Sequence, residues 1–127
     1  MNPDTLRYTE EHEWIVEQRG LYVIGITEYA VEELGEITFV ELPEVGRHLE
    51  VGEDAAVIES VKAASDIFAP VSGVVAEVND ALEMEPDLIN RDPYGKGWIL
   101  KLKDVSEEEY NELMDARSYR GYMKTVE

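Results

Sequence analysis

The chain contains no cysteine among its 127 residues and only two histidines, His12 and His48. Without cysteine it can form no disulfide, no thiolate metal site and no cysteine nucleophile. Two histidines are too few for a histidine-rich metal site, so we predict no bound metal. Any redox chemistry performed by this protein must therefore come from a group that is attached to the chain.

Basic residues are also scarce. The sequence has 11 lysines and arginines against 29 aspartates and glutamates, which gives a formal net charge of −18. Such a chain repels the phosphate backbone of nucleic acids, so we expect no nucleic-acid partner. An acidic surface speeds encounters with proteins that carry basic patches, or it simply keeps a small protein in solution.

Long apolar runs are missing, and with them any segment that could cross a membrane. The N-terminal stretch MNPDTLRYTEEHEW has neither the apolar segment of a secretory signal nor the arginine-rich, acid-poor character of a transit peptide. We therefore expect a cytoplasmic protein of bacterial type with no membrane partner. The length, and the lack of any linker, predict a single domain over residues 1–127.

Short runs rich in valine, isoleucine and aromatic residues dominate what is present, and they predict β-strands. Turn signals such as Arg19-Gly20, Pro43 and Asn79-Asp80 separate them. The predicted strands are residues 14–17, 21–27, 36–42, 55–61, 66–71, 73–78 and 97–103. Seven short strands at this spacing are typical of a sandwich or barrel, so the fold is expected to be mainly β.

Two segments have the end signals of helices. The first runs from Thr27, a suitable N-cap, to a stop at Gly35. The second follows Ser106, which forms a capping box with Glu109, and it predicts a C-terminal helical extension over about residues 106–120.

A weak internal similarity links residues 36–45 with residues 72–81, and each segment is followed by a further apolar strand. Either a duplication or chance accounts for it.

The stretch ESVKAASD places Lys62, the only lysine or arginine between Arg47 and Arg91, inside a β-like region. A hairpin centred on Lys62-Ala63 is one interpretation, although this pair lacks the Asn-Gly or Asp-Gly chemistry of a tight turn. In that register the mirror pairs are Val61 with Ala64, Ser60 with Ser65, Glu59 with Asp66, and Ile58 with Ile67.

The surroundings of Lys62 argue against catalysis, because the neighbouring carboxylates Glu59 and Asp66 would hold the charge on the amine. Two roles remain open from the residues alone. Lys62 is either an ordinary exposed lysine or a handle for covalent modification, with small flanking residues that allow a modifying enzyme to approach.

Several motifs together resemble the H proteins of the glycine cleavage system, in the expected order and over roughly residues 6 to 120. They are HEW (12–14), IGIT (24–27), LGEITFVELPEVG (34–46), ESVKAASD (59–66), APVSGVVAEVN (69–79) and DPYGKGWILKLK (92–103). The resemblance implies a barrel-sandwich hybrid of two antiparallel sheets with short helices, including a C-terminal one. It also implies that Lys62 bears covalently attached lipoic acid within a motif formed by Glu59, Ser60, Val61, Ala63, Ser65 and Asp66.

The same resemblance implies a carrier that is not itself an enzyme. Its lipoyl arm would receive an aminomethyl group at glycine decarboxylase (P protein) and deliver it to aminomethyltransferase (T protein). Dihydrolipoamide dehydrogenase (L protein) would then reoxidise the arm, and lipoate-attaching enzymes would be further partners. Because the loaded arm ends in an amine, the anionic residues Glu13, Asp66 and Glu11 are the candidates to contact it.

Other functions compete with this one. A lipoate-relay paralogue, or another swinging-arm carrier such as a biotin carrier or a lipoyl domain of a 2-oxo-acid dehydrogenase, would also display such a lysine. A hydrolase using paired carboxylates belongs to a different class, but nothing in the sequence positions such a pair. A passive acidic interaction module with unmodified Lys62 is the third class.

Overall fold

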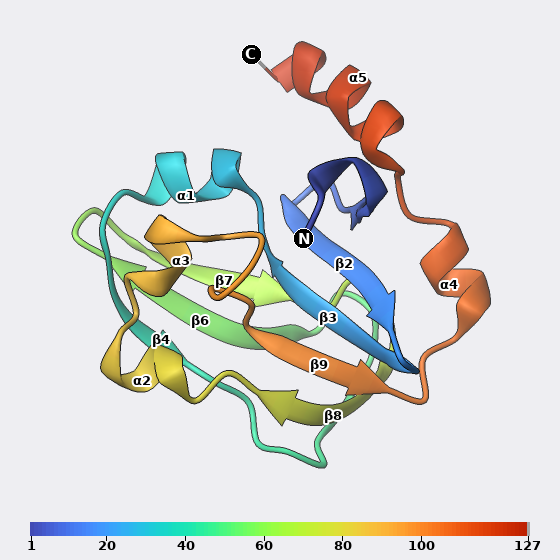
Figure 1. Ribbon diagram of the computed structural model, residues 1–127, viewed down its shortest axis with the longest axis horizontal. Coiled ribbons are helices and arrows are strands. Elements are labelled where there is room, and N and C mark those ends of the chain that lie inside the picture. The colour runs from blue at the N-terminus through green and yellow to red at the C-terminus, as the bar shows by residue number, and fades with distance from the viewer. Residues whose placement is uncertain (127) are drawn as a thin grey trace.

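Two antiparallel β-sheets, packed face to face, form the body of the molecule in the computed structural model, which describes residues 1–126 (Figure 1). The larger sheet has the strand order β1 (Arg7–Tyr8), β2 (Glu13–Gln18), β3 (Leu21–Ile26), β9 (Leu100–Lys103), β8 (Gly73–Val78) and β5 (His48–Leu49). The smaller has the order β4 (Ile37–Glu41), β6 (Asp54–Ser60) and β7 (Ala64–Phe68). The expected mainly β fold with two antiparallel sheets is confirmed.

Short helices lie at the edges of these sheets. They are η1 (Pro3–Thr5), α1 (Glu28–Leu34), α2 (Ala81–Met84), α3 (Leu88–Arg91), α4 (Glu107–Asn111) and α5 (Ala116–Val126). The predicted ends of α1 are confirmed, since the Thr27 side chain accepts a hydrogen bond from the Ala30 amide and Gly35 ends the helix at a φ of 77°. The C-terminal segment holds two helices, and α5 continues to Val126.

Each of the seven predicted strands has a counterpart, and two more exist that the sequence did not predict. These are β1 and β5, which are two residues long and therefore too short to show an alternating pattern. The internal similarity corresponds to β4 and β8. Each of them pairs with the apolar strand that follows its segment, β4 with β6 and β8 with β9.

Alternation along the strands of the larger sheet creates two separate apolar regions. Ile15 and Ile24 face the smaller sheet and belong to an aliphatic core between the sheets. Trp14 and Val23 point to the opposite face, where η1 and α5 cover a second, mostly aromatic cluster. We call these regions the inner core and the outer cluster.

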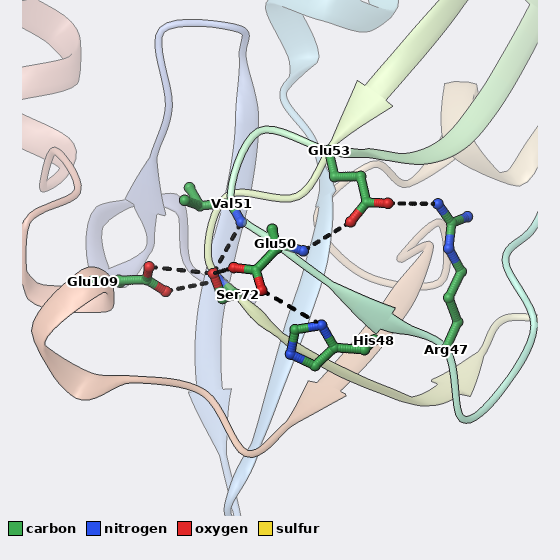
Figure 2. Close-up of polar contacts among 7 residues, drawn as sticks. All are labelled: Arg47, His48, Glu50, Val51, Glu53, Ser72 and Glu109. Carbon is green, nitrogen blue, oxygen red and sulfur yellow. Dashed lines mark hydrogen bonds and ion pairs between the residues drawn. The ribbon is translucent and has the colours of Figure 1, made fainter.

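Helix α4 is held against the larger sheet by a polar contact that its sequence did not predict. Ser106 caps the helix as expected, accepting a hydrogen bond from the Glu109 amide. The Glu109 carboxylate does not return to Ser106 but accepts the Ser72 amide at 2.8 Å, and its other oxygen lies 3.2 Å from the Ser72 hydroxyl. Figure 2 shows Ser72 between Glu109 and Glu50, with the Val51 amide donating to its hydroxyl.

Candidate functional site

Lys62 lies on the turn that joins β6 and β7, so the hairpin itself is confirmed. Its register differs from the prediction by two residues, because Ile58 pairs with Ser65 and Glu59 pairs with Ala64. The centre of the turn is therefore Val61-Lys62 rather than Lys62-Ala63.

The Ser60 side chain explains this register. Its hydroxyl accepts hydrogen bonds from the amides of Lys62 and Ala63, and the Ser60 amide donates to the Ala63 carbonyl at 2.8 Å. A serine that satisfies the turn amides in this way replaces the Asn-Gly chemistry that a tight turn usually needs. The Val61 amide also donates to the Glu36 carbonyl at 3.0 Å, which ties the turn to the smaller sheet.

The lysine side chain is exposed, and its stem lies across the end of helix α1. A β-carbon placed on Gly35 would come within 3.3 Å of Lys62 Cε. Within residues 1–126 the amine forms no ion pair, and the predicted pairing of Glu59 with Asp66 is wrong. The shifted register separates these carboxylates, since Asp66 pairs with Val57 rather than with Glu59.

The remaining residues of the predicted attachment motif surround this turn. Val61 is 64% exposed and Ala63 and Ala64 are exposed, so the approach to Lys62 is not blocked. Glu59 is exposed on β6, and Ser65 is half-buried on β7.

A cleft of about 410 Å³ lies beside the turn, between helix α1 and strand β7. Tyr29, Glu33 and Leu34 line its α1 side, and Asp66 lines its β7 side. Glu11 completes an acidic rim. Of the three predicted anionic contacts, the structure thus brings Asp66 and Glu11 to the cleft surface.

Glu13, the third of these residues, is buried with 2% of its surface exposed. Its carboxylate accepts the Thr9 hydroxyl at 2.7 Å and the Phe68 amide at 3.2 Å, so it links β2 to the strand that leaves the lysine turn. Burial raises the pKa of Glu13 to about 7, against the effect of these two hydrogen bonds, and the charge of Glu11 adds to the increase. Near neutral pH this carboxyl group therefore exists in both protonation states.

His12 connects the cleft to helix α5. Its Nδ1 lies 2.8 Å from the Tyr119 hydroxyl, which is 3.3 Å from the Thr27 hydroxyl. The imidazole also packs on the Tyr29 ring, with ring centroids 4.6 Å apart. Burial lowers the pKa of His12, although the charges of Glu11 and Glu33 oppose this effect. This shift favours the neutral form of the ring.

Sequence reasoning missed three residues of this site. Tyr29 and Glu33 lie one turn apart on α1, and that spacing places them on one helix face. Thr9 belongs to no recognisable sequence motif. Its position four residues before Glu13 does allow a local contact, and its hydroxyl accepts a hydrogen bond from the Glu13 amide.

Among residues 1–126, no three histidine, aspartate or glutamate side chains come together as a metal site. Every helix in this part of the chain is too short or too polar to span a lipid bilayer.

Known proteins resemble the chain over nearly its whole length. The model of the family described as glycine cleavage H-protein matches residues 6–126. The glycine cleavage system H protein of Escherichia coli O7:K1 is 53% identical over 123 residues, which cover 96% of this chain and 95% of the relative. That of Cronobacter sakazakii is 52% identical with the same coverage.

A solved structure agrees with these relatives. The crystal structure of a glycine cleavage system H protein from Mycobacterium marinum has a TM-score of 0.86 and 39% sequence identity to this chain. The match covers 97% of this chain and 99% of that one. These similarities agree with the lysine turn and its adjoining cleft, and they show that the chain belongs to the glycine cleavage H-protein family.

Proposed function

We propose that this protein is the lipoyl-bearing carrier of a glycine cleavage system and that lipoic acid is attached to Nζ of Lys62. One observation carries the proposal. The ESVKAASD motif of the family lies on an exposed β-turn, with an amine that makes no ion pair among residues 1–126 and with small residues on both sides.

The residues of the turn fit this attachment. Hydrogen bonds that the Ser60 hydroxyl accepts from the Lys62 and Ala63 amides fix the turn backbone, so an arm attached to Lys62 has a rigid base and a free end. Forming the amide removes the lysine charge, which prevents the acidic surface from holding the arm in one place. Lipoic acid attached to Lys62 would supply a disulfide–dithiol couple that carries the aminomethyl group from glycine decarboxylase to aminomethyltransferase, with the dithiol reoxidised by dihydrolipoamide dehydrogenase.

The cleft beside the turn gives the chain a place to hold the cationic end of its cargo. Asp66 and Glu11 line the cleft and attract an ammonium group, and Glu13 lies buried within the same region. Leu34 and the ring of Tyr29 give one side of the cleft an apolar surface. In this proposal the chain positions and protects the cargo, while the bond-breaking steps belong to the partner enzymes, so the carrier is not an enzyme.

The partners follow from the same proposal. They are the P, T and L proteins and the enzymes that attach lipoate, all of which must approach the exposed turn. A cytoplasmic location and the absence of nucleic-acid and membrane partners remain predictions from the charge and the N-terminal sequence.

The attachment is tested by measuring the intact mass of the protein after expression in cells that attach lipoate. We expect a lipoyl addition that proteolysis maps to Lys62, and Lys62→Arg should lose it completely while the far-UV spectrum stays unchanged. A lipoyl addition that survives Lys62→Arg would refute the assignment. A biotinyl addition would identify a biotin carrier, and an unmodified protein would favour the passive acidic module.

The shuttle role is tested by reconstituting glycine decarboxylation with the three partner enzymes. Full-length lipoylated protein should support carbon dioxide release, and Lys62→Arg should not. If lipoylated protein supports no release, lipoate relay between proteins becomes the better description.

Glu13→Ala should also speed the loss of ammonia from the loaded carrier in free solution, and an unchanged rate would remove Glu13 from the cargo site.

A further inference from the structure

Asn90 makes contacts that the function proposed above does not use. It is half-buried on helix α3, and its neighbours Leu88 and Ile89 anchor that helix in the inner core. Helix α3 lies beside α1 (Figure 1). From this position the Asn90 side chain reaches the segment that joins α1 to β4, residues 35–37.

One side-chain amide holds two consecutive peptide groups of this segment. Asn90 Nδ2 donates to the Gly35 carbonyl at 2.8 Å, which fixes the peptide group between Gly35 and Glu36. Asn90 Oδ1 accepts the Ile37 amide at 3.0 Å, which fixes the next peptide group. Asparagine can make both bonds because its amide carries a donor and an acceptor side by side. We call residues 35–37 the clamped segment.

The clamped segment in turn holds the lysine turn. The Glu36 carbonyl belongs to the same peptide group as the Ile37 amide, and it accepts the Val61 amide at 3.0 Å. Because this peptide group is trans and planar, Asn90 and Val61 bind opposite ends of one rigid unit. The stem of Lys62 also lies against Gly35, since a β-carbon there would come within 3.3 Å of Lys62 Cε. The position of Asn90 is therefore passed on to the turn.

The neighbouring strands support the turn only in part. The register between β4 and β6 shifts between Ile37 and Phe39, so this ladder is irregular where it approaches the turn. On the other side, β7 is an edge strand of the smaller sheet. The link through Asn90 connects the turn to a helix that the inner core holds, which adds the support that the sheet lacks.

We propose that Asn90 is a positioning residue for lipoate attachment, an inference that rests on the proposed function. Through the clamped segment it holds the Lys62 turn in the orientation that the attaching enzyme binds. A turn that is ordered before it binds loses little conformational freedom on docking. The enzyme must also bring Nζ to an activated acyl group within a narrow range of distance and angle.

Asn90 takes no part in the bond-forming step. In that step Nζ of Lys62, as the neutral amine, attacks the carbonyl carbon of an activated lipoyl group such as lipoyl-adenylate. The C–N bond forms as the bond to the phosphate oxygen breaks, AMP leaves, and the nitrogen loses one proton. Among residues 1–126 the side chain of Asn90 bonds to the backbone of the clamped segment and not to Nζ. Its loss should therefore weaken recognition of the carrier and leave the chemical step unchanged.

Hydrogen exchange on the full, unmodified chain tests the structural link. Asn90→Ala should quicken exchange of the Val61 amide at least tenfold and leave the Ile58 amide in β6 unchanged. Asn79→Ala is the matched control, because Asn79 also holds backbone carbonyls, those of Lys96 and Trp98, at 2.8 and 2.7 Å. It should change Val61 exchange less than twofold. Unchanged Val61 exchange in Asn90→Ala would overturn the link.

The role in attachment is tested by the kinetics of a lipoate-attaching enzyme supplied with lipoyl-adenylate. Asn90→Ala should raise the KM for the carrier at least fivefold and change kcat less than twofold, whereas Asn79→Ala should leave both within twofold. Asn90→Asp keeps the size of the side chain and loses the donor to the Gly35 carbonyl, so it should raise KM at least twofold. It decides the question if Asn90→Ala does not fold. An unchanged KM in a folded Asn90 variant would overturn the proposal, and so would equal increases in the Asn79 and Asn90 variants.

A small acylating reagent separates recognition from exposure of the amine. Acetic anhydride needs no oriented turn, so it should acetylate Lys62 at the same rate in wild type and Asn90→Ala, as measured by peptide mass. A rate that falls as much as the enzymatic one would overturn positioning and would indicate a less accessible amine. If the wild type is never lipoylated, the proposed function fails, and with it the role of Asn90 in attachment. Val61 exchange would still show separately whether Asn90 fixes the turn.

Discussion

The inner core and the outer cluster stabilise the same sheet in different ways. Between the sheets, aliphatic side chains such as Ile15, Ile24 and Ile58 are almost completely buried and interlock without directional contacts. On the other face, each of the buried aromatic residues Tyr8, Trp14 and Tyr119 also has a polar anchor. Trp14 donates to the Pro93 carbonyl at 3.0 Å, and the Tyr119 hydroxyl meets His12 and Thr27.

This difference indicates what each region does. The inner core fixes the two sheets and with them the lysine hairpin, since β6 contributes Ile58 only a few residues before the turn. The outer cluster fixes the C-terminal helix and, through His12, one wall of the cleft. Loss of packing in the first region should unfold the protein, whereas loss in the second should release α5.

Ile58→Ala should have the largest effect on stability. The side chain is fully buried, so its loss removes apolar contacts and leaves a cavity, at a cost of about 4 kcal/mol in the free energy of unfolding. Denaturant unfolding followed by circular dichroism measures this cost. Val61→Ala, on the exposed turn of the same hairpin, should change stability by less than about 0.5 kcal/mol. Similar costs at the two positions would contradict the assignment of Ile58 to the inner core.

Glu13, which hydrogen-bonds to the Thr9 hydroxyl and the Phe68 amide, should make stability depend on pH. Its pKa is about 7 in the folded protein against an ordinary value of 4.5, so the folded state binds the proton more tightly than the unfolded state does. The resulting stabilisation is fully present below pH 4.5 and is lost as the pH rises through 7. At about 1.4 kcal/mol for each pKa unit, the total change is about 3 kcal/mol.

Glu13→Gln, which cannot ionise, isolates this effect. The stability of the variant relative to the wild type should increase by about 3 kcal/mol between pH 4 and pH 8, as measured by urea unfolding at several pH values. Glu32→Gln, an exposed control, should give a difference that stays nearly constant. A constant difference for Glu13→Gln would show that the carboxyl group titrates normally.

Gly25→Ala should damage the outer cluster by overpacking. Gly25 pairs with Trp14, and an added β-carbon would lie 2.5 Å from the indole ring, so the ring must move at a cost of about 2 kcal/mol. Thermal unfolding measures the change. The same substitution at Gly121 in α5, where nothing lies within 4 Å, should instead stabilise the protein by up to about 1 kcal/mol. Two changes of the same sign would be evidence against this packing.

Tyr119→Phe should have the smallest effect and the most local one. It keeps the ring that stacks on Tyr8 but removes the hydroxyl that meets His12, at a cost of about 1 kcal/mol. Hydrogen exchange should quicken in α5 and stay unchanged in β6. Tyr29→Phe, which keeps the ring packed against His12, serves as the control. Equal protection of α5 in wild type and Tyr119→Phe would mean that this hydroxyl does not hold the helix.

Local signals in the sequence were sufficient for much of the fold. Runs of β-branched residues located the main strands, and Thr27 and Gly35 marked both ends of α1 because capping depends on residues only a few positions apart. The strands β1 and β5 were missed because two residues are too few to show the alternation of apolar and polar side chains that marks a strand. Their pairing depends on partners elsewhere in the chain.

Contacts over long sequence separations limited the prediction of the site. The motif located Lys62, but the register of its hairpin depends on hydrogen bonds that Ser60 makes with turn amides. The burial of Glu13 depends on Phe68, which is 55 residues away, and no local pattern distinguishes this carboxylate from the exposed Glu11. Long-range packing, and not residue type, divides these acidic residues into buried and exposed groups.

The strand order has a consequence for how the protein folds during synthesis. Strand β9 follows the other strands of the larger sheet in the chain, yet it lies inside this sheet between β3 and β8. Until it emerges, β3 and β8 each have an unpaired edge that can join another nascent chain. A polypeptide that ends before Leu100 should therefore aggregate, because the larger sheet cannot be completed without β9.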